Sequence, residues 1–279
     1  MLIKKIAILV IGIVLLAAFN AFSMNMEDMT LSLDKVKKSV TIVFSSIDKE
    51  LAQAASQLSA VNLDEPRMRK ILNDLSKAHG YIIDCAFVDA SGKMVIVEPK
   101  EYNQHEGADI SKQKQVMAVK KLKKPVLSSV FRSVEGIEAI DFEYPVFFGK
   151  GDFAGSLSML VRQDALFGDT AMPFVWDKSC KVWVMQKDGL IVYDPDPGQI
   201  GRNIFSDSLF EKFEGLISFS RTVAASKSGG GSYDFYSKGL TDTKIVRKYA
   251  VWDTVSLYGT EWRVIVMEAE KPVVSVLKP

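Results

Sequence analysis

The chain repeats one strand-turn-strand pattern in its middle and near its end, and this repeat constrains the fold more than any other feature. The first copy spans residues 88–99 and is followed by Gly107–Ile110; the second spans residues 185–195 and is followed by Gly201–Ile204. Each copy reads as a strand, a tight turn with glycine, a second strand ended by proline, and a Gly-x-[Asp/Asn]-Ile corner. This matched order predicts two similar domains in tandem rather than one large fold.

Length and charge agree with two globular domains that do not bind nucleic acid. The chain has 279 residues and 48% hydrophobic content, enough for a core in each domain. Its 35 Lys and Arg residues nearly balance 34 Asp and Glu residues, and no basic stripe of the kind that a phosphate backbone requires is present. The basic run over residues 112–124 fits a solvated helix face.

The N-terminus predicts export or membrane attachment. Residues 6–19 form an unbroken apolar run behind Lys4 and Lys5, which is the layout of a secretory signal or a signal anchor. The run continues to Phe22 and is borderline in length for spanning a bilayer. No small-x-small cleavage site follows, so we expect residues 1–25 to be an uncleaved anchor rather than a cleaved signal peptide. In either case, the remaining chain is expected outside the cytoplasmic membrane, anchored or secreted.

Periodicity predicts an α+β fold with a long N-terminal helix followed by two units. Apolar residues at helical spacing predict a helix over about residues 26–60, and Asp64 is the expected N-cap of a second helix that ends at Gly80. A first unit is expected over residues 81–162 and a second over residues 163–270, after a helical segment over 26–80 and before a tail over 271–279. Each unit is predicted to contain one helix and a five-stranded antiparallel sheet. The expected strands are 82–88, 94–97, 126–132, 137–148 and 153–161, then 182–186, 190–193, 232–236, 244–252 and 261–268; the expected helices are 112–123 and 207–226.

Several phrases in this order resemble the extracytoplasmic double Cache (double PDC) sensor domain of membrane-bound histidine kinases and chemoreceptors. The resemblance covers nearly everything after the N-terminal apolar run. It rests on residues 107–110, 144–146 and 153–157 in the first unit, and on residues 188–194, 200–205, 250–253 and 259–262 in the second.

The resemblance implies a long helix followed by two PAS-like units, each a curved antiparallel sheet with helices and loops on one face. It implies that amino acids, carboxylates or amines bind between sheet and loops, with the main pocket in the first, membrane-distal unit. The Tyr, Arg-Trp-Tyr and Asp set of the amino-acid-binding subgroup has no counterpart here. No kinase, HAMP or methyl-accepting module follows, so we expect signalling through a separate membrane receptor or kinase.

A pocket for a small polar ligand needs an apolar wall and a few aimed polar groups. In the first unit, Arg132 could bind a carboxylate in a bidentate manner, while Asp141 and Tyr144 could bind an ammonium and close the pocket. Strand alternation places Asp141 and Tyr144 on opposite faces, which favours a solvated Asp141 opposite a core aromatic face. The first-unit candidates are Tyr102, Asp109, Phe131, Arg132, Asp141 and Tyr144.

In the second unit, the loop over residues 194–203 could direct Arg202 toward an anion. The competing interpretation is structural, because Asp-Pro-Asp-Pro-Gly makes consecutive turns and residues 201–203 position the next helix. Trp252 is more often a core residue than a ligand contact. The weaker, second-unit candidates are Tyr193, Asp194, Arg202, Tyr233, Lys248 and Trp252.

No pattern indicates catalysis, a cofactor or a metal. His79 and His105 lack metal-ligand spacing, and Gly229–Ser232 reads as a turn because no Lys-[Ser/Thr] follows it. Cys85 and Cys180 are expected to be buried thiols.

Two functions follow from the sequence. One is a ligand-binding sensor module in signal transduction, with the long helix as a homodimer surface. The alternative is a non-sensing assembly module of a membrane or surface complex that uses the same fold.

Overall fold

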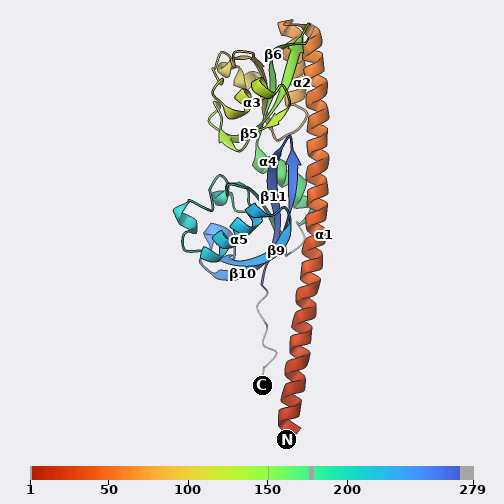
Figure 1. Cartoon of the computed structure of the whole chain (residues 1–279), viewed down its shortest axis with the longest axis vertical. Coiled ribbons are helices and arrows are strands. Elements are labelled where there is room, and N and C mark those ends of the chain that lie inside the picture. The colour runs from red at the N-terminus through yellow and green to blue at the C-terminus, as the bar shows by residue number, and fades with distance from the viewer. Residues whose placement is uncertain (1, 150, 176–178, 271–279) are drawn as a thin grey trace.

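The structure, a computed structural model, describes residues 2–149, 151–175 and 179–270, with side chains from Met26 onward. A single helix, α1 (Leu2–Val61), runs along the whole length of the molecule, and two β-sheet units are stacked along one side of it (Figure 1). The first unit lies at the end of α1 farther from the N-terminus, and the second unit lies closer to it.

The first unit is a six-stranded antiparallel sheet with the order β2-β1-β6-β5-β3, in which β4 also pairs with β5. Its strands are β1 (Ile82–Asp89), β2 (Met94–Glu98), β3 (Val126–Leu127), β4 (Phe131–Arg132), β5 (Glu138–Phe148) and β6 (Asp152–Val161). Its helices are α2 (Glu65–Ser76), η1 (Lys100–His105) and α3 (Lys114–Leu122). As predicted, Asp64 caps α2: its carboxylate accepts a hydrogen bond from the Arg67 backbone N–H.

The second unit is a five-stranded antiparallel sheet with the order β8-β7-β11-β10-β9. Its strands are β7 (Lys181–Gln186), β8 (Ile191–Tyr193), β9 (Gly229–Tyr236), β10 (Ile245–Leu257) and β11 (Thr260–Ala269). Its helical segments are α4 (Gln163–Ala171), η2 (Met172–Phe174), η3 (Pro197–Gln199), η4 (Ser208–Phe210), α5 (Glu214–Ala225) and η5 (Gly239–Thr241).

The two copies of the sequence repeat form the same structure. The Gly92 and Gly189 turns have φ values of 95° and 91°, a backbone conformation that favours glycine. Isolated bridges join Lys93 to Asp109 and Leu190 to Asn203, at equivalent positions of the two copies. The predicted duplicated α+β fold is therefore confirmed, with six rather than five strands in the first sheet; the predicted domain boundaries stay a prediction.

Some predicted elements differ from the structure. The strand over 126–132 is split into β3 and β4, the helix over 207–226 is split into η4 and α5, and the connector after Arg162 contains α4. The predicted turn at Gly229 is wrong, because residues 229–231 pair with β10. The Trp252 ring covers this stretch so closely that a Cβ at Gly229 would lie 2.4 Å from it. The glycines therefore make room for an aromatic ring rather than form a turn.

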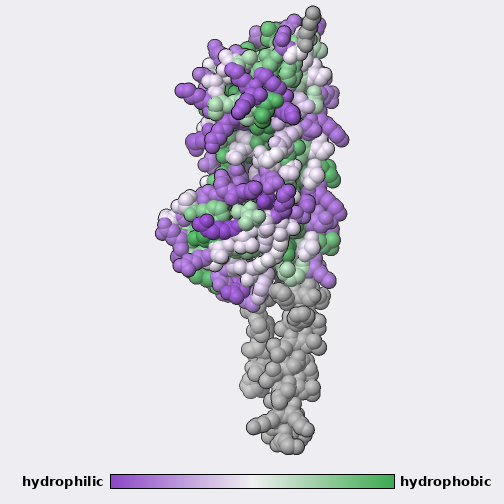
Figure 2. Space-filling view, viewed as in Figure 1, coloured by the Kyte–Doolittle hydropathy of each residue, from purple (hydrophilic) through white to green (hydrophobic). Residues whose placement is uncertain are grey.

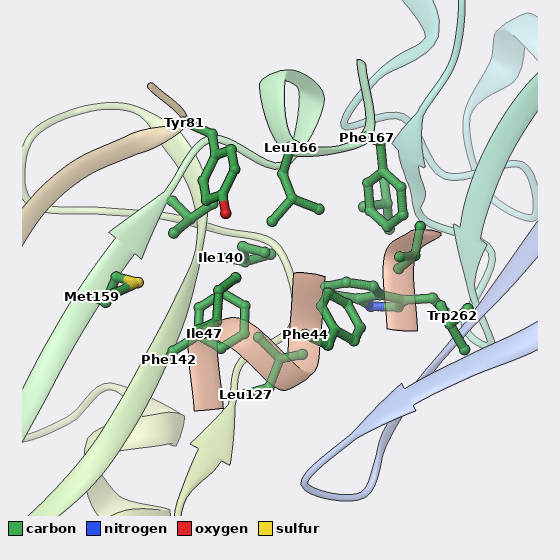
Figure 3. Close-up of a cluster of buried hydrophobic side chains, with 14 of the residues drawn as sticks. Phe44, Ile47, Tyr81, Leu127, Ile140, Phe142, Met159, Leu166, Phe167 and Trp262 are labelled. Carbon is green, nitrogen blue, oxygen red and sulfur yellow. The ribbon is translucent and has the colours of Figure 1, made fainter. Parts of the chain in front are cut away.

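The core is continuous from α1 into both units. The buried residues of α1 recur every three to four positions and include Val36, Val40, Phe44, Ile47 and Leu51. The Phe44 ring lies 5.5 Å from Trp262 of β11 and 6.3 Å from Phe142 of β5, measured between centroids (Figure 3). One side chain of α1 therefore contacts the cores of both units.

Polar contacts add to this packing between α1 and the second unit. Lys37 forms an ion pair with Asp253 of β10, with 2.6 Å between Nζ and Oδ2, and the Tyr258 hydroxyl donates a hydrogen bond to Asp48. Asp253 lies on the face of the second sheet that meets α1, and Tyr258 lies in the turn between β10 and β11.

The outer surface gives a mixed pattern. Figure 2 shows hydrophilic and hydrophobic residues interspersed over both units on the face in view. Within the part of the chain whose side chains are described, no helix has a stretch long and apolar enough to cross a membrane. The predicted anchor over residues 1–25 lies outside that part.

Replacing Phe44 should destabilise the protein strongly. We expect Phe44→Ala to lower the free energy of unfolding by about 3–5 kcal/mol, because it removes a fully buried ring from a closely packed junction. Ile42→Ala is the matched control, because this side chain of the same helix is 69% exposed and should change the free energy by at most about 0.5 kcal/mol. Urea denaturation of both variants measures the difference; equal losses would contradict the assignment of Phe44 as a shared core residue.

Candidate functional site

The second unit contains a cavity of about 370 Å³ on the sheet face that points away from α1. The sheet forms its floor, and the loop through η3 together with η5 forms its cover. The lining residues are Lys181, Trp183, Ile191, Asp194, Pro195, Asp196, Pro197, Gln199, Ile204, Leu216, Tyr233, Phe235, Ser237, Lys238, Gly239, Thr241, Lys248 and Met267.

Strand alternation places the wall residues on this face. In β7, Val182 and Val184 pack in the core that includes α1, whereas Trp183 faces the opposite core under α5. In β9, Tyr233 and Phe235 share the same face, two residues apart. These aromatic side chains form an apolar wall around the polar groups that follow.

Lys248 is a buried cation that faces the cavity. Tyr233 is its cross-strand partner in the register between β9 and β10, and its Nζ lies 5.4 Å from the centroid of the Phe235 ring. The residue is only 4% exposed, and it forms no hydrogen bond or ion pair with any residue that the structure describes. Burial lowers the pKa of Lys248, while the charge of Asp194 opposes this shift. Because a buried charge without a direct partner is costly, this ammonium favours an anionic guest.

Asp194 supplies the opposite charge at the end of β8. Its Oδ1 accepts hydrogen bonds from the Asp196 backbone N–H at 2.8 Å and from Gln199 Nε2 at 3.0 Å. Burial raises the pKa of Asp194 to about 7, although the bond from Asp196 and the charge of Lys248 act in the opposite direction. The cavity therefore combines a cation, an anion and an apolar wall.

The cover of the cavity is held by a second carboxylate. Asp196 accepts hydrogen bonds from the backbone N–H groups of Gly198 and Leu240, so it joins the η3 loop to η5. Gly239 has a φ of 76°, and a Cβ there would lie 2.3 Å from the Asp196 carboxylate. Glycine at this position allows the two loops to approach each other closely.

The structure brings together three of the predicted second-unit residues, Asp194, Tyr233 and Lys248. Tyr193 lies on the opposite face of the sheet, with its ring 6.1 Å from that of Phe167. Arg202 pairs with Asp207 at 2.9 Å and donates to the Gly198 carbonyl, so it supports the loop from outside the cavity.

The sixth predicted residue, Trp252, lies beyond the cavity wall on the same sheet face. Its ring packs edge-to-face against Phe219, with 5.5 Å between centroids.

In the first unit, two of the candidate residues, Phe131 and Asp141, line a small cavity of about 10 Å³. The expected solvation of Asp141 is wrong: this side chain is 2% exposed and accepts hydrogen bonds from Ser158 at 2.8 Å and Gln115 at 3.3 Å. The reason is that α3 and the loop before β5 cover this face of the sheet. Tyr144 lies on the other face and packs against the core that α1 shares.

The other first-unit candidates lie apart from this cavity. Arg132 is exposed on β4, and Asp109 is exposed and accepts a hydrogen bond from the Ser111 backbone N–H. The Tyr102 ring stacks against His105 at 6.5 Å. The first unit also has a wide, shallow depression of about 660 Å³ between α2 and η1, which none of the candidate residues lines. The implied main pocket of the first unit stays a prediction, and the more enclosed cavity of about 370 Å³ lies in the second unit.

Sequence reasoning missed several lining residues. Trp183 and Phe235 could have been found, because Phe235 lies two residues after Tyr233 and alternation places Trp183 opposite the valines of β7. Lys181 and Gln199 carry no such signal, since the position of the η3 loop decides whether they face the cavity.

Part of the chain matches the sequence model of a family of sensor domains. Residues 42–163 match the family described as HK/GC/chemotaxis protein-like, sensor domain. No curated protein matches the chain in sequence.

Solved structures of receptor and kinase domains are similar to this chain over most of its length. An extracellular ligand binding receptor from Desulfohalobium retbaense is similar over 86% of this chain, with 31% identity and a TM-score of 0.72; the chain spans 40% of that receptor. The extracellular domain described as that of the histidine kinase rpHK1S-Z16 matches over 92% of this chain and 99% of its own length, with 18% identity and a TM-score of 0.69.

A third solved structure was determined with its ligand. The ligand binding domain of the Pseudomonas aeruginosa amino acid chemoreceptor PctC, in complex with GABA, matches over 89% of this chain and 99% of its own length, with 13% identity and a TM-score of 0.59. At 18% and 13% identity, this structure and the kinase domain show a shared fold.

Asp194 should make stability depend on pH. Because its pKa is raised to about 7 in the folded state, the folded protein holds this proton more tightly than the unfolded chain, and stability falls as pH rises from about 4 to 7. We expect Asp194→Asn to remove this loss and to be more stable than the parent by about 1–3 kcal/mol at pH 8 but not at pH 4. Denaturation at both pH values measures this; a difference independent of pH would contradict it.

Proposed function

We propose that this chain, a double Cache sensor domain of the kind found in histidine kinases and chemoreceptors, binds a small organic ligand in the cavity of its second unit. The observation that carries the proposal is Lys248, a buried ammonium that faces a cavity of about 370 Å³ without a direct ion-pair partner among the described residues. A ligand carboxylate would supply the missing counter-charge.

The charges of the cavity favour a ligand of the amino acid class. Lys248 would bind the carboxylate, and Asp194 would bind the ammonium, whose charge favours the ionised form of that carboxyl group. Trp183, Tyr233 and Phe235 would contact the apolar part of the ligand. The chemoreceptor PctC, which has the same fold, was solved with GABA, a compound that carries the same two charged groups. Simple carboxylates would use only Lys248, and simple amines only Asp194.

The binding signal would leave the second unit through β10. This strand carries Lys248 on the cavity face and Asp253, which pairs with Lys37 of α1, on the other. A ligand that binds one arrangement of β10 more tightly than another would shift the position of α1. We place the two units outside the cytoplasmic membrane, attached through residues 1–25, with α1 as a dimer surface and a separate receptor or kinase as partner.

Calorimetric titration of the full-length chain with amino acids, carboxylates and amines tests the proposal. We expect an amino acid to bind and Lys248→Met to weaken its binding at least about 10-fold, because removing one charged partner typically costs over 1.4 kcal/mol. Lys244→Met is the matched control, since Lys244 is exposed near the start of the same strand and does not line the cavity. Equal affinity in the two variants, or no binding across the panel, would overturn the proposal.

A further inference from the structure

We infer that the cavity of the second unit selects amino acids that carry a second carboxylate in their side chain, and that Lys181 and Lys238 bind this group. The selection rests on the proposed function, because it concerns the same ligand in the same cavity. Glutamate and aspartate are the common members of this ligand class.

The lining of the cavity carries more positive than negative charge. Its charged residues are the lysines Lys181, Lys238 and Lys248 and the aspartates Asp194 and Asp196, which leaves a net charge of +1 when all five are ionised. A neutral amino acid adds no net charge to this set, whereas an acidic amino acid adds one negative charge. The charge of the lining therefore complements an acidic amino acid.

The two aspartates do not neutralise the additional lysines. Asp196 accepts hydrogen bonds from the backbone N–H groups of Gly198 and Leu240, and Asp194 is the proposed partner of the ligand ammonium. The ammonium groups of Lys181 and Lys238 form no hydrogen bond or ion pair with any residue that the structure describes. Two cations thus face the cavity without a direct partner once an amino acid occupies Lys248 and Asp194.

One further acidic side chain lies near Lys238. Asp242 follows η5, and its carboxylate accepts hydrogen bonds from the Ser237 hydroxyl and from the Lys244 backbone N–H. Asp242 does not line the cavity. It therefore leaves the cavity side of Lys238 open to a ligand.

Lys181 and Lys248 lie at separate places on the floor of the cavity. In the second sheet, β11 lies between β7, which carries Lys181, and β10, which carries Lys248. Two strand spacings separate the backbones of β7 and β10 by about 10 Å. Lys181 shares the cavity face with Trp183, two residues further along β7. A ligand whose first carboxylate binds Lys248 can therefore direct a second carboxylate toward Lys181.

Lys238 contributes a positive charge from the cover of the cavity. It is the N-cap residue of η5, and the neighbouring Ser237 and Thr241 also line the cavity with hydroxyl groups. A carboxylate has acceptor sites for several donors, so it can bind cations from the floor and the cover together. Because Lys181 and Lys238 are both exposed, water weakens these ion pairs, and the selection should be several-fold rather than absolute.

Calorimetric titration of the full-length chain with matched ligands tests the selection. At pH 8, Asp194 is ionised, since its pKa is about 7. We expect L-glutamate or L-aspartate to bind about 3- to 10-fold more tightly than L-glutamine or L-asparagine, which have nearly the same shape without the second charge. Glutarate and succinate, which lack the ammonium, should bind more weakly than the corresponding amino acid. Equal affinity for the acid and its amide in both pairs, or for the acid and its dicarboxylate, would overturn the inference.

Variants connect the selection to the two lysines. Lys181→Met and Lys238→Met should each lower the ratio of acid to amide affinity toward 1, and the ratio in the parent should fall as salt is added. Both side chains are exposed, so the fold should tolerate these changes, and the exposed Lys244→Met should keep the parent ratio. A ratio that stays at the parent value in both Lys181→Met and Lys238→Met would contradict their role.

Failure of this selection is distinguishable from failure of the proposed function. If the amides bind as tightly as the acids and Lys248→Met weakens both, the amino acid site stands and the selection is wrong. If no amino acid binds the parent chain, the proposed site itself is wrong.

Discussion

The packing of Phe44 against both units is the contact on which the remaining architecture depends. Its ring reaches Phe142 in one sheet and Trp262 in the other, and Phe167 of α4 packs on the far side of Trp262 with 5.5 Å between the centroids (Figure 3). Because α1 covers one face of the second sheet, the cavity of about 370 Å³ forms on the opposite face, under the loops. The long helix therefore decides on which side of its sheet the second unit can accept a ligand.

The two units treat buried charge on that opposite face differently. In the second unit, Lys248 and Asp194 place opposite charges around a cavity large enough for a small molecule. In the first unit, Asp84, Asp141 and Glu143 are buried, and no Lys, Arg or His among the described residues forms an ion pair with them. The same scaffold thus places both signs of charge around the cavity of the second unit, whereas it buries only acidic groups together in the first.

The face of the sheet on which a strand side chain lies was predictable from alternation. The helices and loops that join the strands and cover the sheet were not predictable from local patterns. Alternation correctly separated Asp141 from Tyr144, since side chains of a strand point to opposite faces whatever lies around them. The same reasoning failed on the burial of Asp141, because α3 and a distant loop cover it. It also missed α4, whose residues become a helix by packing Leu166 and Phe167 into the shared core.

The sequence by itself determined the duplication, the long amphipathic helix, the order of the strands and the turns that require glycine, because these depend on residues close together in the chain. It also indicated Asp194, Tyr233 and Lys248 as candidates. Only the tertiary structure decided that these three surround one cavity and that Asp84, Asp141 and Glu143 of the first unit are buried. Burial and the meeting of charges depend on contacts between segments far apart in sequence, which no local pattern records.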